Sequence, residues 1–398
     1  MSEVINGSLQ GIDGNKVIDG ALATTEEHFF EGAEKLLEIW FASSSPSEHG
    51  ADPPRSLRTV SIEKLRWICE IAHCQILSVV SNEHIDAYLL SESSMYVSDR
   101  RFILKTCGRT SLMHTVRPVI GIASSDCGLD IVTNIFYSRK NFRRPELQPE
   151  PHTSFEFESN HLDELFEDGA GYCLGRVNQD RWYMYTLNPS VEVTPNFADQ
   201  TLEILMTHLD EGIMNTFFTS ECRTADEASK RSGIDQLMPT GATVDHYLFE
   251  PCGYSLNAIL PDSDQYITIH ITPESEFSYV SFETNVNQNE INELVKKVLK
   301  CFKPGRFLLT LIYNEASKQE CEGHLAAYET RFAGYRRCDA QFLELPDYYL
   351  SYTHHVAVAD NHGNGNEQRV GKGENGRWNR VAVRTSSGSG SNSLSDSE

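Results

Sequence analysis

Residues 266–272 read Tyr-Ile-Thr-Ile-His-Ile-Thr, and this stretch decides the fold class. Its three isoleucines occupy every second position, so they share one face of an extended strand, while the hydroxyl and imidazole side chains share the other. Residues 101–107, 182–187 and 277–283 alternate in a similar way. Strands that are apolar on one face and polar on the other are typical of antiparallel sheets. The sequence therefore predicts a strand-rich fold.

Helical periodicity marks three further segments. Apolar residues recur at intervals of three and four over residues 61–72, 159–166 and 289–301, which is the spacing of a helix with one buried face. Together with the alternating strands, these helices predict an α+β protein.

The composition of the whole chain indicates which cellular compartment and which kinds of binding partner to expect. With 398 residues, of which 39% are hydrophobic, the chain can form a substantial core. It contains no apolar run of 18 residues and no signal-peptide pattern, so we expect a cytoplasmic protein without membrane contact. The net charge of −23 opposes binding to nucleic acid. The ten cysteines lack metal-ligand spacing, so we expect free thiols and no bound metal.

Both ends of the chain differ in composition from the middle. Residues 1–25 are rich in Gly, Asn and small residues, and from about Asp360 onward the chain is rich in Gly, Asn and Ser. Such segments bury too little apolar surface to fold. We expect one folded domain over residues 26–355, flanked by disordered ends at 1–25 and 356–398.

A weak internal echo links two places in the chain. Tyr88-Leu-Leu-Ser-Glu-Ser-Ser, followed by the strand at 101–107, is similar to Tyr254-Ser-Leu-Asn-Ala-Ile, followed by the strand at 266–272. In both places a small polar loop leads into an alternating strand. Unrelated hairpins can look alike, so chance similarity and internal duplication both stay open.

Two side chains stand out as candidates for chemistry. Alternation places Cys107 on the same strand face as Lys105, and a nearby ammonium lowers the pKa of a thiol. His270 shares its face with Thr268 and Thr272, where an imidazole can act as a base or be held as a structural residue. On the residues alone, the ordinary structural interpretation is the commoner one for both.

Two segments near acidic residues are ambiguous. In a strand, Asp199, Thr201 and Glu203 share one face, which would bury carboxylates. In a helix over residues 201–208 these acids would lie in or near the solvated first turn, which the helix dipole favours. The residues alone favour the helix. Residues 28–41 fit a helix and a strand equally well.

Six motifs follow one another along the chain. They read Phe29-Phe-Glu-Gly-Ala-Glu-Lys-Leu-Leu-Glu, Leu90-Ser-Glu-Ser-Ser-Met, Phe102-Ile-Leu-Lys-Thr-Cys-Gly, Asp199-Gln-Thr-Leu-Glu, Pro251-Cys-Gly-Tyr-Ser and His270-Ile-Thr-Pro-Glu. Together they resemble the eukaryotic S-adenosylmethionine decarboxylase proenzymes, and the animal-type enzymes more than the plant ones. The similarity covers roughly residues 28–350.

The resemblance implies a fold. The family is a four-layer α/β/β/α sandwich, with two antiparallel sheets face to face, helices outside, and two similar halves. On this basis the segments around Glu34 and Asp199 are expected to be strands, and the internal echo is expected to reflect a duplication.

The resemblance also implies self-cleavage. The Ser93 hydroxyl would attack the carbonyl carbon of Glu92, and elimination would leave a β chain, 1–92, and an α chain, 93–398, that begins with a pyruvoyl group made from Ser93. This covalent cofactor would hold S-adenosylmethionine as a Schiff base and accept electrons while carbon dioxide leaves. The product, S-adenosylmethioninamine, is the aminopropyl donor for spermidine and spermine.

The family's functional residues map onto specific positions here. The resemblance assigns Cys107 as the proton donor and Ser255 and His270 to processing. Substrate binding would involve rings on both sides of the adenine, a carboxylate on the ribose hydroxyls, and further active-site acids. These residues are Phe30, Phe249, Glu274, Glu92, Glu31 and Glu34.

The same family binds putrescine as an activator among buried acids. The corresponding residues are Glu38, Phe136, Ser138, Asp199, Thr201, Glu203 and Glu283. Clustered carboxylates must take up protons or a counter-cation, and a short diamine supplies two charges. Ile312 stands where the animal family usually has an aromatic residue, so we expect weaker binding.

The resemblance further implies a homodimer of αβ units. Two other functions compete with this interpretation. One is an inactive homologue that regulates an active decarboxylase, although such proteins lose the processing serine and Ser93 is present. The other is a thiol hydrolase built on Cys107 and His270, which needs a third orienting group and predicts an uncleaved chain.

Overall fold

The computed structural model describes residues 29–44, 55–187, 197–286, 291–320 and 330–358. The predicted disordered ends lie outside these ranges, except that the last strand ends at Ala357, just inside the predicted tail. All nine cysteines within the described ranges are free thiols. No described helix combines the length and the apolarity that a membrane crossing requires.

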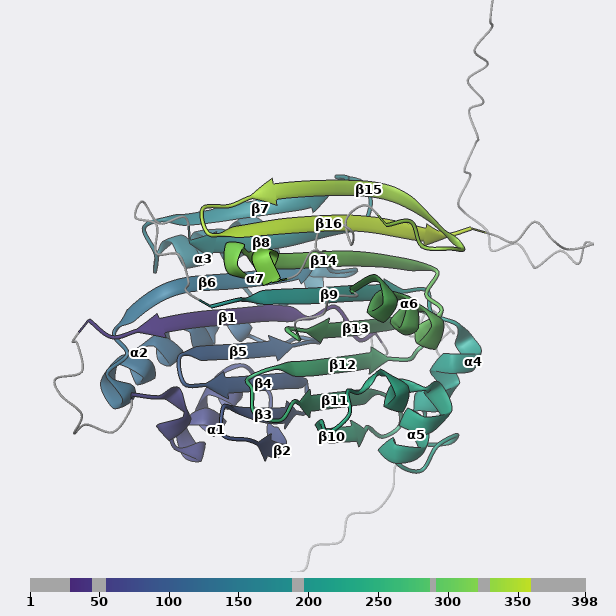
Figure 1. Ribbon diagram of the computed structural model, residues 1–398, viewed down its shortest axis with the longest axis horizontal. Coiled ribbons are helices and arrows are strands. Elements are labelled where there is room, and N and C mark those ends of the chain that lie inside the picture. Colours follow the sequence, from purple (N-terminus) through teal and green to yellow (C-terminus); the bar gives the residue numbers. More distant parts are fainter. Residues whose placement is uncertain (1–28, 45–54, 188–196, 287–290, 321–329, 359–398) are drawn as a thin grey trace, which may run out of the picture. The chain divides into compact units, whose positions relative to one another are not determined.

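Sixteen strands form two antiparallel eight-stranded sheets (Figure 1). The first sheet has the order β2-β3-β4-β5-β1-β6-β8-β7, and the second has the order β10-β11-β12-β13-β9-β14-β16-β15. The strands of the first sheet are β1 (Lys35–Ala42), β2 (Ile76–Ser81), β3 (Ile85–Leu90), β4 (Ser93–Ser98), β5 (Arg101–Thr106), β6 (Ile131–Lys140), β7 (Gly169–Gly175) and β8 (Arg181–Leu187). Those of the second are β9 (Gln200–Thr207), β10 (Thr243–Leu248), β11 (Tyr254–Ile259), β12 (Tyr266–Thr272), β13 (Tyr279–Thr284), β14 (Arg306–Asn314), β15 (Tyr335–Glu344) and β16 (Tyr348–Ala357).

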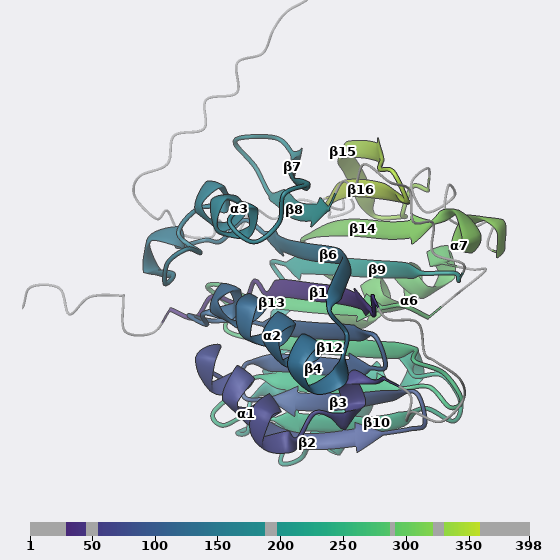
Figure 2. The same cartoon turned by 90° about the vertical axis from the view of Figure 1, so that its left-hand side faces the viewer.

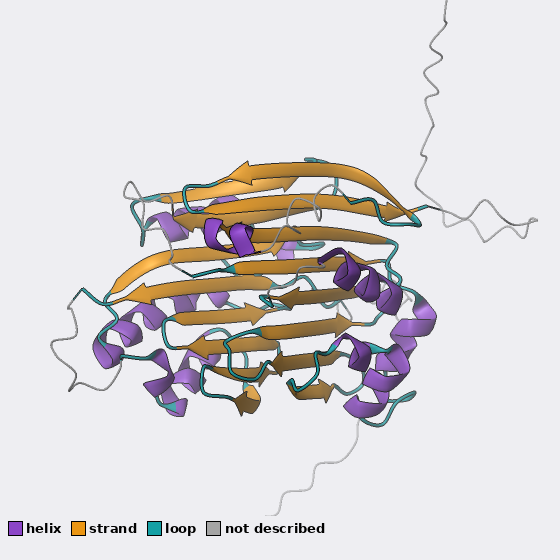
Figure 3. Ribbon diagram, in the orientation of Figure 1, coloured by secondary structure: helices purple, strands orange, loops and turns teal. Residues whose placement is uncertain are grey.

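Helices cover the outer faces of the two sheets, which gives the predicted α/β/β/α sandwich (Figures 2 and 3). They are α1 (Ile62–Ile71), α2 (Val116–Cys127), α3 (Phe155–Asp163), α4 (Glu211–Met214), α5 (Ala225–Ser232), α6 (Ile291–Phe302) and α7 (Glu315–Glu320). Short 3₁₀ helices occupy Leu57–Thr59, Leu112–Thr115, Pro145–Leu147, Asn215–Phe217 and Ile234–Leu237.

The two halves of the chain have the same topology. Adding eight to each strand number of the first sheet gives the order of the second, so β1 to β8 correspond one by one to β9 to β16. This confirms the expected two similar halves. The echo that suggested a duplication was only half correct, however. β3 does correspond to β11, but the partner of β5 is β13, and β12 instead corresponds to β4.

Most predicted elements are confirmed within one or two residues, and α3 is the exception. The periodicity predicts a helix over residues 159–166, whereas α3 begins at Phe155. Ser154 caps its N-terminus by accepting a hydrogen bond from the Phe157 N–H. Glu158 is fully buried against Arg139 and interrupts the apolar pattern. The spacing of apolar residues therefore did not predict the first turn of α3.

The ambiguous acidic segment is a strand. Residues 200–207 form β9, so the helix that the residues alone favoured over 201–208 is wrong, and the family-based expectation is confirmed. β9 lies between β13 and β14 and pairs with both. A central position in the sheet outweighs the local preference for acids in a first helical turn. Residues 35–42 form β1, which settles the second ambiguity as a strand.

The layer between the sheets is divided into apolar and charged parts. One apolar cluster lies towards β7 and β15 and includes Trp182 and Tyr352, and a second lies towards β2 and β10 and includes Tyr96 and Tyr266. Buried charged side chains of the central strands lie between these clusters, among them Lys105. Buried charges need partners, and these partners form the functional site.

Candidate functional site

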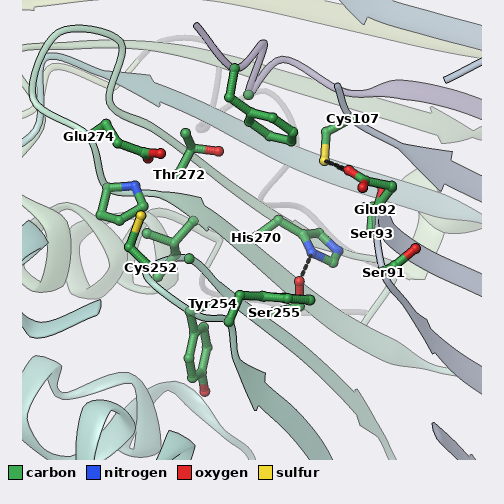
Figure 4. A pocket seen from close by; sticks show the side chains of 16 residues that line it. Ser91, Glu92, Ser93, Cys107, Cys252, Tyr254, Ser255, His270, Thr272 and Glu274 are labelled. Carbon is green, nitrogen blue, oxygen red and sulfur yellow. Dashed lines mark hydrogen bonds between the residues drawn. The ribbon is translucent and has the colours of Figure 1, made fainter. Parts of the chain in front are cut away.

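A cavity of about 240 Å³ opens beside the turn between β3 and β4. Both halves of the chain line it (Figure 4). Its lining residues are Phe30, Gly32, Ser91, Glu92, Ser93, Cys107, Phe249, Cys252, Gly253, Tyr254, Ser255, His270, Ile271, Thr272, Pro273 and Glu274. Eight residues assigned from the resemblance to cleavage, catalysis or substrate binding, Glu92 among them, thus meet in one place.

The bond between Glu92 and Ser93 lies in a tight turn. Leu90 of β3 pairs directly with Ser93 of β4, so only Ser91 and Glu92 form the loop. Ser93 has a backbone φ of +126°, a region that favours glycine. A non-glycine residue held there stores strain of about 1 to 3 kcal/mol.

Hydrogen bonds fix both reacting groups of this turn. The Ser93 hydroxyl donates to Glu34 Oε1 at 3.2 Å. The Glu92 carbonyl oxygen accepts from the Cys107 N–H at 3.0 Å and from the Cys107 thiol at 3.4 Å. Cys107 reaches this carbonyl because Thr106 pairs with Ser93 in the β4–β5 ladder, which places the next residue beside the turn.

The electrostatics of Cys107 differ from the sequence prediction. Burial raises the pKa of its thiol well above the ordinary value, and the carboxyls of Glu92 and Glu34 raise it further. The cation that opposes this rise is Lys35, whereas the Lys105 ammonium contacts Glu283 on the opposite sheet. The result is a thiol that keeps its proton at neutral pH, which suits a proton donor better than a thiolate nucleophile.

His270 is buried and hydrogen-bonded at both ring nitrogens. Its Nδ1 lies 2.8 Å from the hydroxyl of Ser255, which is its direct partner in the β11–β12 ladder. Its Nε2 lies 3.0 Å from the Ser94 hydroxyl and 2.8 Å from that of Thr268. Burial lowers the pKa of His270 well below its ordinary value, and Lys105 lowers it further, so the ring is neutral.

The predicted substrate-binding residues fall into two groups. Phe30 and Phe249 line the cavity, as does Glu274, which lies just past the end of β12. Glu274 Oε2 is buried and has no hydrogen-bond partner among the described residues, so a ligand donor can satisfy it. Glu31 does not line this cavity. Its carboxylate instead accepts from the Arg143 and Arg144 N–H groups, at 2.7 and 3.2 Å.

The first part of the acidic cluster is centred on Arg101 of β5. Its guanidinium binds Glu38 at 2.9 Å and lies 3.9 Å from Asp199. Tyr348 donates to Asp199 at 3.0 Å, and Trp40 donates to Glu38 at 2.5 Å. Burial raises the pKa of both carboxyls in spite of the Arg101 charge.

The second part is centred on Lys105. Its ammonium lies 2.6 Å from Glu283, 3.3 Å from Glu203 and 3.8 Å from Glu34. Burial alone would lower the pKa of Lys105, but these three carboxyls together raise it. Burial raises the pKa of Glu203 to about 7 even though Lys105 opposes the shift. Trp182 also donates to Glu203, at 3.0 Å.

The remaining predicted diamine-binding residues lie around these acids. Phe136 pairs with Glu38, and Ser138 pairs with Leu36, so both point into the layer between the sheets. Thr201 pairs with Ile312 in the β9–β14 ladder. The Phe136 ring packs edge-on against Tyr348, with 5.0 Å between centroids, so this region retains aromatic side chains although Ile312 is aliphatic.

Sequence reasoning missed several side chains that organise the site. Trp182 and Tyr348 bind the acids, and Ser94 and Asn257 lie beside His270. Asn257 had a signal that was not used, since it is two residues after Ser255 on an alternating strand and therefore shares its face. The others come from distant strands and had no local signal.

Sequence comparisons with known proteins identify the family. Residues 27–356 match the sequence model of a family described as adenosylmethionine decarboxylase. An S-adenosylmethionine decarboxylase proenzyme of Caenorhabditis elegans is 45% identical over 338 residues, covering 85% of this chain and 90% of the nematode protein. A Xenopus laevis protein of the same name is 46% identical over 328 residues, which cover 82% of this chain and 95% of the Xenopus protein. A crystal structure of a Trypanosoma brucei AdoMetDC-delta26 monomer matches 71% of this chain and 100% of its own, with 21% identity and a TM-score of 0.49.

Proposed function

The chain belongs to the adenosylmethionine decarboxylase family, whose members depend on a pyruvoyl group, and we propose that it makes this group by cutting its own backbone between Glu92 and Ser93. The observation that carries the proposal is the β3–β4 turn. It combines a strained Ser93, a hydrogen-bonded Ser93 hydroxyl and a carbonyl on Glu92 that accepts hydrogen bonds. The relatives are themselves named proenzymes, which supports a cleaved mature form.

The first step transfers the acyl group of Glu92 from nitrogen to oxygen. The Ser93 oxygen adds to the Glu92 carbonyl carbon, the C–N bond breaks, and an ester and a free amine result. Glu34 accepts the hydrogen bond of the attacking hydroxyl. The Cys107 N–H stabilises the negative charge that develops on the carbonyl oxygen. Loss of the strained backbone at Ser93 favours the shift.

The second step is an elimination. A base removes the α-proton of Ser93, and the carboxylate of Glu92 leaves as the new C-terminus of the 1–92 chain. The dehydroalanine that remains hydrolyses, releases ammonia and becomes the pyruvoyl group. His270 suits the base because its ring is neutral and its Nδ1 is directed towards Ser255 at the cavity wall.

The residues around Ser93 fit such a group and its substrate. The pyruvoyl carbonyl supplies an electron acceptor for decarboxylation. Cys107 holds a proton that it can return to the substrate's α-carbon. Phe30 and Phe249 offer ring faces for the adenine and for the sulfonium charge. The unpartnered Glu274 Oε2 accepts from the ribose hydroxyls.

The buried acids support putrescine as an activator. Five carboxylates, those of Glu34, Glu38, Asp199, Glu203 and Glu283, meet two permanent cations in the described part of the chain. The cations are Arg101 and Lys105. The carboxylates therefore exceed the cations by three. A diamine with two charges reduces this excess in a region where uncompensated charge is costly. Putrescine binding would then favour the conformation that orients the catalytic groups.

The product would enter polyamine synthesis as an aminopropyl donor, and the active unit would be a dimer of αβ pairs. An inactive regulatory homologue is not favoured, because Ser93, Cys107, Ser255 and His270 are all present in one cavity. A thiol hydrolase is not favoured either, because the Cys107 thiol is hydrogen-bonded to Glu92.

An intact-mass measurement on the purified protein tests the central claim. We expect two chains, residues 1–92 and 93–398, with the second blocked at its N-terminus by a ketone. Cyanoborohydride in the presence of S-adenosylmethionine should add covalently bound substrate only to the second chain. A single full-length species would refute self-cleavage.

A further inference from the structure

Three hydroxyl groups converge on one buried amide oxygen beside the processing base. Asn257 Oδ1 on β11 accepts hydrogen bonds from Ser94 at 2.6 Å, from Tyr96 at 2.7 Å and from Thr268 at 3.1 Å. These donors come from β4 and β12, so Asn257 connects the two sheets. The amide is 0% exposed.

The direction of these hydrogen bonds determines the protonation of His270. A carbonyl oxygen has no proton to give, so all three hydroxyls donate to Asn257. Ser94 and Thr268 each have one proton and have used it, so they can only accept from His270 Nε2, at 3.0 and 2.8 Å. Nε2 therefore carries the ring proton. Nδ1 holds the lone pair and accepts from Ser255 at 2.8 Å.

We propose that Asn257 is a positioning residue for self-cleavage, which fixes His270 in the tautomer whose basic nitrogen, Nδ1, faces the Ser255 hydroxyl at the cavity wall. This inference rests on the proposed function, because it names the residue that prepares the base for the elimination step. Asn257 acts through Ser94 and Thr268 and does not touch the reacting atoms.

The arrangement has an evident structural disadvantage. Asn257 Nδ2 is buried without a hydrogen-bond partner among the described residues. A leucine has a similar shape and would leave no unsatisfied nitrogen there, but it would remove the acceptor that three buried hydroxyls share. The contribution of this side chain is therefore its oxygen, which orients those hydroxyls.

The orientation of the amide is what matters chemically. If Asn257 were turned over, Nδ2 would donate to the hydroxyls, which could then donate to His270 Nε2. The ring proton would move to Nδ1, and Nδ1 could no longer accept a proton. Because the His270 ring is neutral, its tautomer rather than its charge decides whether the base is competent.

Nitrogen NMR tests the tautomer directly. The full chain is labelled with ¹⁵N-histidine and carries Ser93→Ala, which keeps it uncleaved. The His270 signals are assigned by their loss in Ser93→Ala/His270→Gln. Nε2 couples to both carbon-bound ring protons over two bonds and Nδ1 to only one, so the protonated nitrogen can be identified. We expect the proton on Nε2, and on Nδ1 at least in part after Asn257→Leu.

Two further variants separate this role from a general loss of packing. Asn257→Asp keeps an acceptor oxygen, so we expect the proton to stay on Nε2. Asn285→Leu removes another buried amide of the same sheet, one that binds the backbone of Tyr266 and Asp264. It should lower thermal stability without moving the His270 proton.

The chemical consequence is measured with Ser93 intact. We expect Asn257→Leu to slow chain cleavage at least about tenfold, the lower end of typical effects of residues that orient a functional group. The ester should accumulate, because only the elimination needs the base. Hydroxylamine, which cleaves esters, should then release residues 1–92 and leave an α chain that begins with unmodified serine. Asn257→Asp should cleave faster than Asn257→Leu.

The inference and the proposed function fail in different ways. If the unmodified chain is never cleaved, self-cleavage is wrong, whatever the NMR spectrum shows. If that chain is cleaved but His270 carries its proton on Nδ1 before any change at Asn257, the inference is wrong. It is also wrong if Asn257→Leu leaves both the tautomer and the cleavage rate unchanged.

Discussion

The two halves of the molecule share one topology and almost none of their chemistry. In the first half, β4 begins with Ser93, the residue proposed to become the pyruvoyl group, and in the second half the corresponding strand β12 carries His270. β5 supplies the cation Lys105, and its counterpart β13 supplies the acid Glu283 that binds it at 2.6 Å. The two sheets have the same strand order, but the residues that face each other across the layer are complementary.

This difference shows why neither half is a functional unit. The first half contributes the bond to be cut and the thiol, and the second contributes the neutral base, the Ser255 hydroxyl and the Glu274 carboxylate. His270 also contacts the first half, because the Ser94 hydroxyl lies 3.0 Å from its Nε2. Changes on the two sides should therefore fail at different steps, and the following experiments use that asymmetry.

Ser93→Ala should have the largest effect, because it removes the hydroxyl that attacks the Glu92 carbonyl carbon. Without the hydroxyl no ester can form, so we expect a full-length chain with no decarboxylase activity. The fold should survive the loss of one oxygen. Denaturing electrophoresis and release of labelled carbon dioxide measure both results.

The control for this change is Ser98→Ala, which removes a hydroxyl from the other end of the same buried strand. It should be cleaved and active. Appearance of the 93–398 fragment in Ser93→Ala would show that the acyl shift does not start from this residue.

Cys107→Ala should separate processing from turnover within the first half. The Cys107 N–H bond to the Glu92 carbonyl belongs to the backbone and survives the substitution, so we expect some cleavage to continue. Loss of the thiol proton should lower decarboxylation by roughly 100- to 10,000-fold, the usual contribution of a general acid. Single-turnover measurements on cleaved protein give this factor. The control is Cys127→Ala, at another buried thiol, which should behave like the unmodified protein. If Cys107→Ala turned over as fast as the unmodified protein, a different proton donor would be required.

The sequence carried enough information for the elements but not for their contacts. Alternation in residues 266–272 predicted β12 without error, because one face of this strand meets an apolar core and the other meets polar groups. The acidic strand β9 could not be predicted from its own residues. Its acids are stable only because Arg101 and Lys105 lie on the opposite sheet, far away in the chain.

The same limit applies to charge within the site. Adjacency on one strand face suggested that Lys105 lowers the pKa of the Cys107 thiol. The ammonium is instead drawn across the layer to three carboxyls, and burial raises the thiol pKa. Motif resemblance located the reactive residues, whereas their protonation depends on packing between the sheets.

Glu274→Gln should produce a smaller effect that is confined to substrate binding in the second half. The carboxylate contributes an unsatisfied acceptor but no reacting group, so we expect KM to rise about tenfold with kcat almost unchanged. Steady-state kinetics on fully cleaved protein separate the two constants. Glu276→Gln, two residues away on the same loop, should leave both unchanged. A fall in kcat of similar size would place Glu274 in the chemistry instead.

The smallest expected effect concerns activation by putrescine and its dependence on pH. In protein freed of copurified polyamine, we expect the diamine to raise the decarboxylation rate by about fivefold, the low end of typical coupling between sites, because the aliphatic Ile312 offers no ring face to the diamine. Glu203→Gln should reduce this stimulation, since it removes a charge at nearly constant shape. Glu293→Gln, at an exposed acid that pairs with Lys296 on α6, should not.

The sign of the pH dependence follows from the pKa of Glu203, which burial raises from 4.5 to about 7. Below this value the folded protein holds a neutral carboxyl at this position, and the diamine loses one attraction. Above it the carboxylate is ionised while Lys105 stays charged, so affinity should increase as the pH rises from about 6 to 8 and then level off. Titration of the rate with putrescine across this range measures the change, and Glu203→Gln should flatten it. Equal activity with and without putrescine throughout would mean that Arg101 and Lys105 already balance the acids, and that the charge between the two halves needs no external partner.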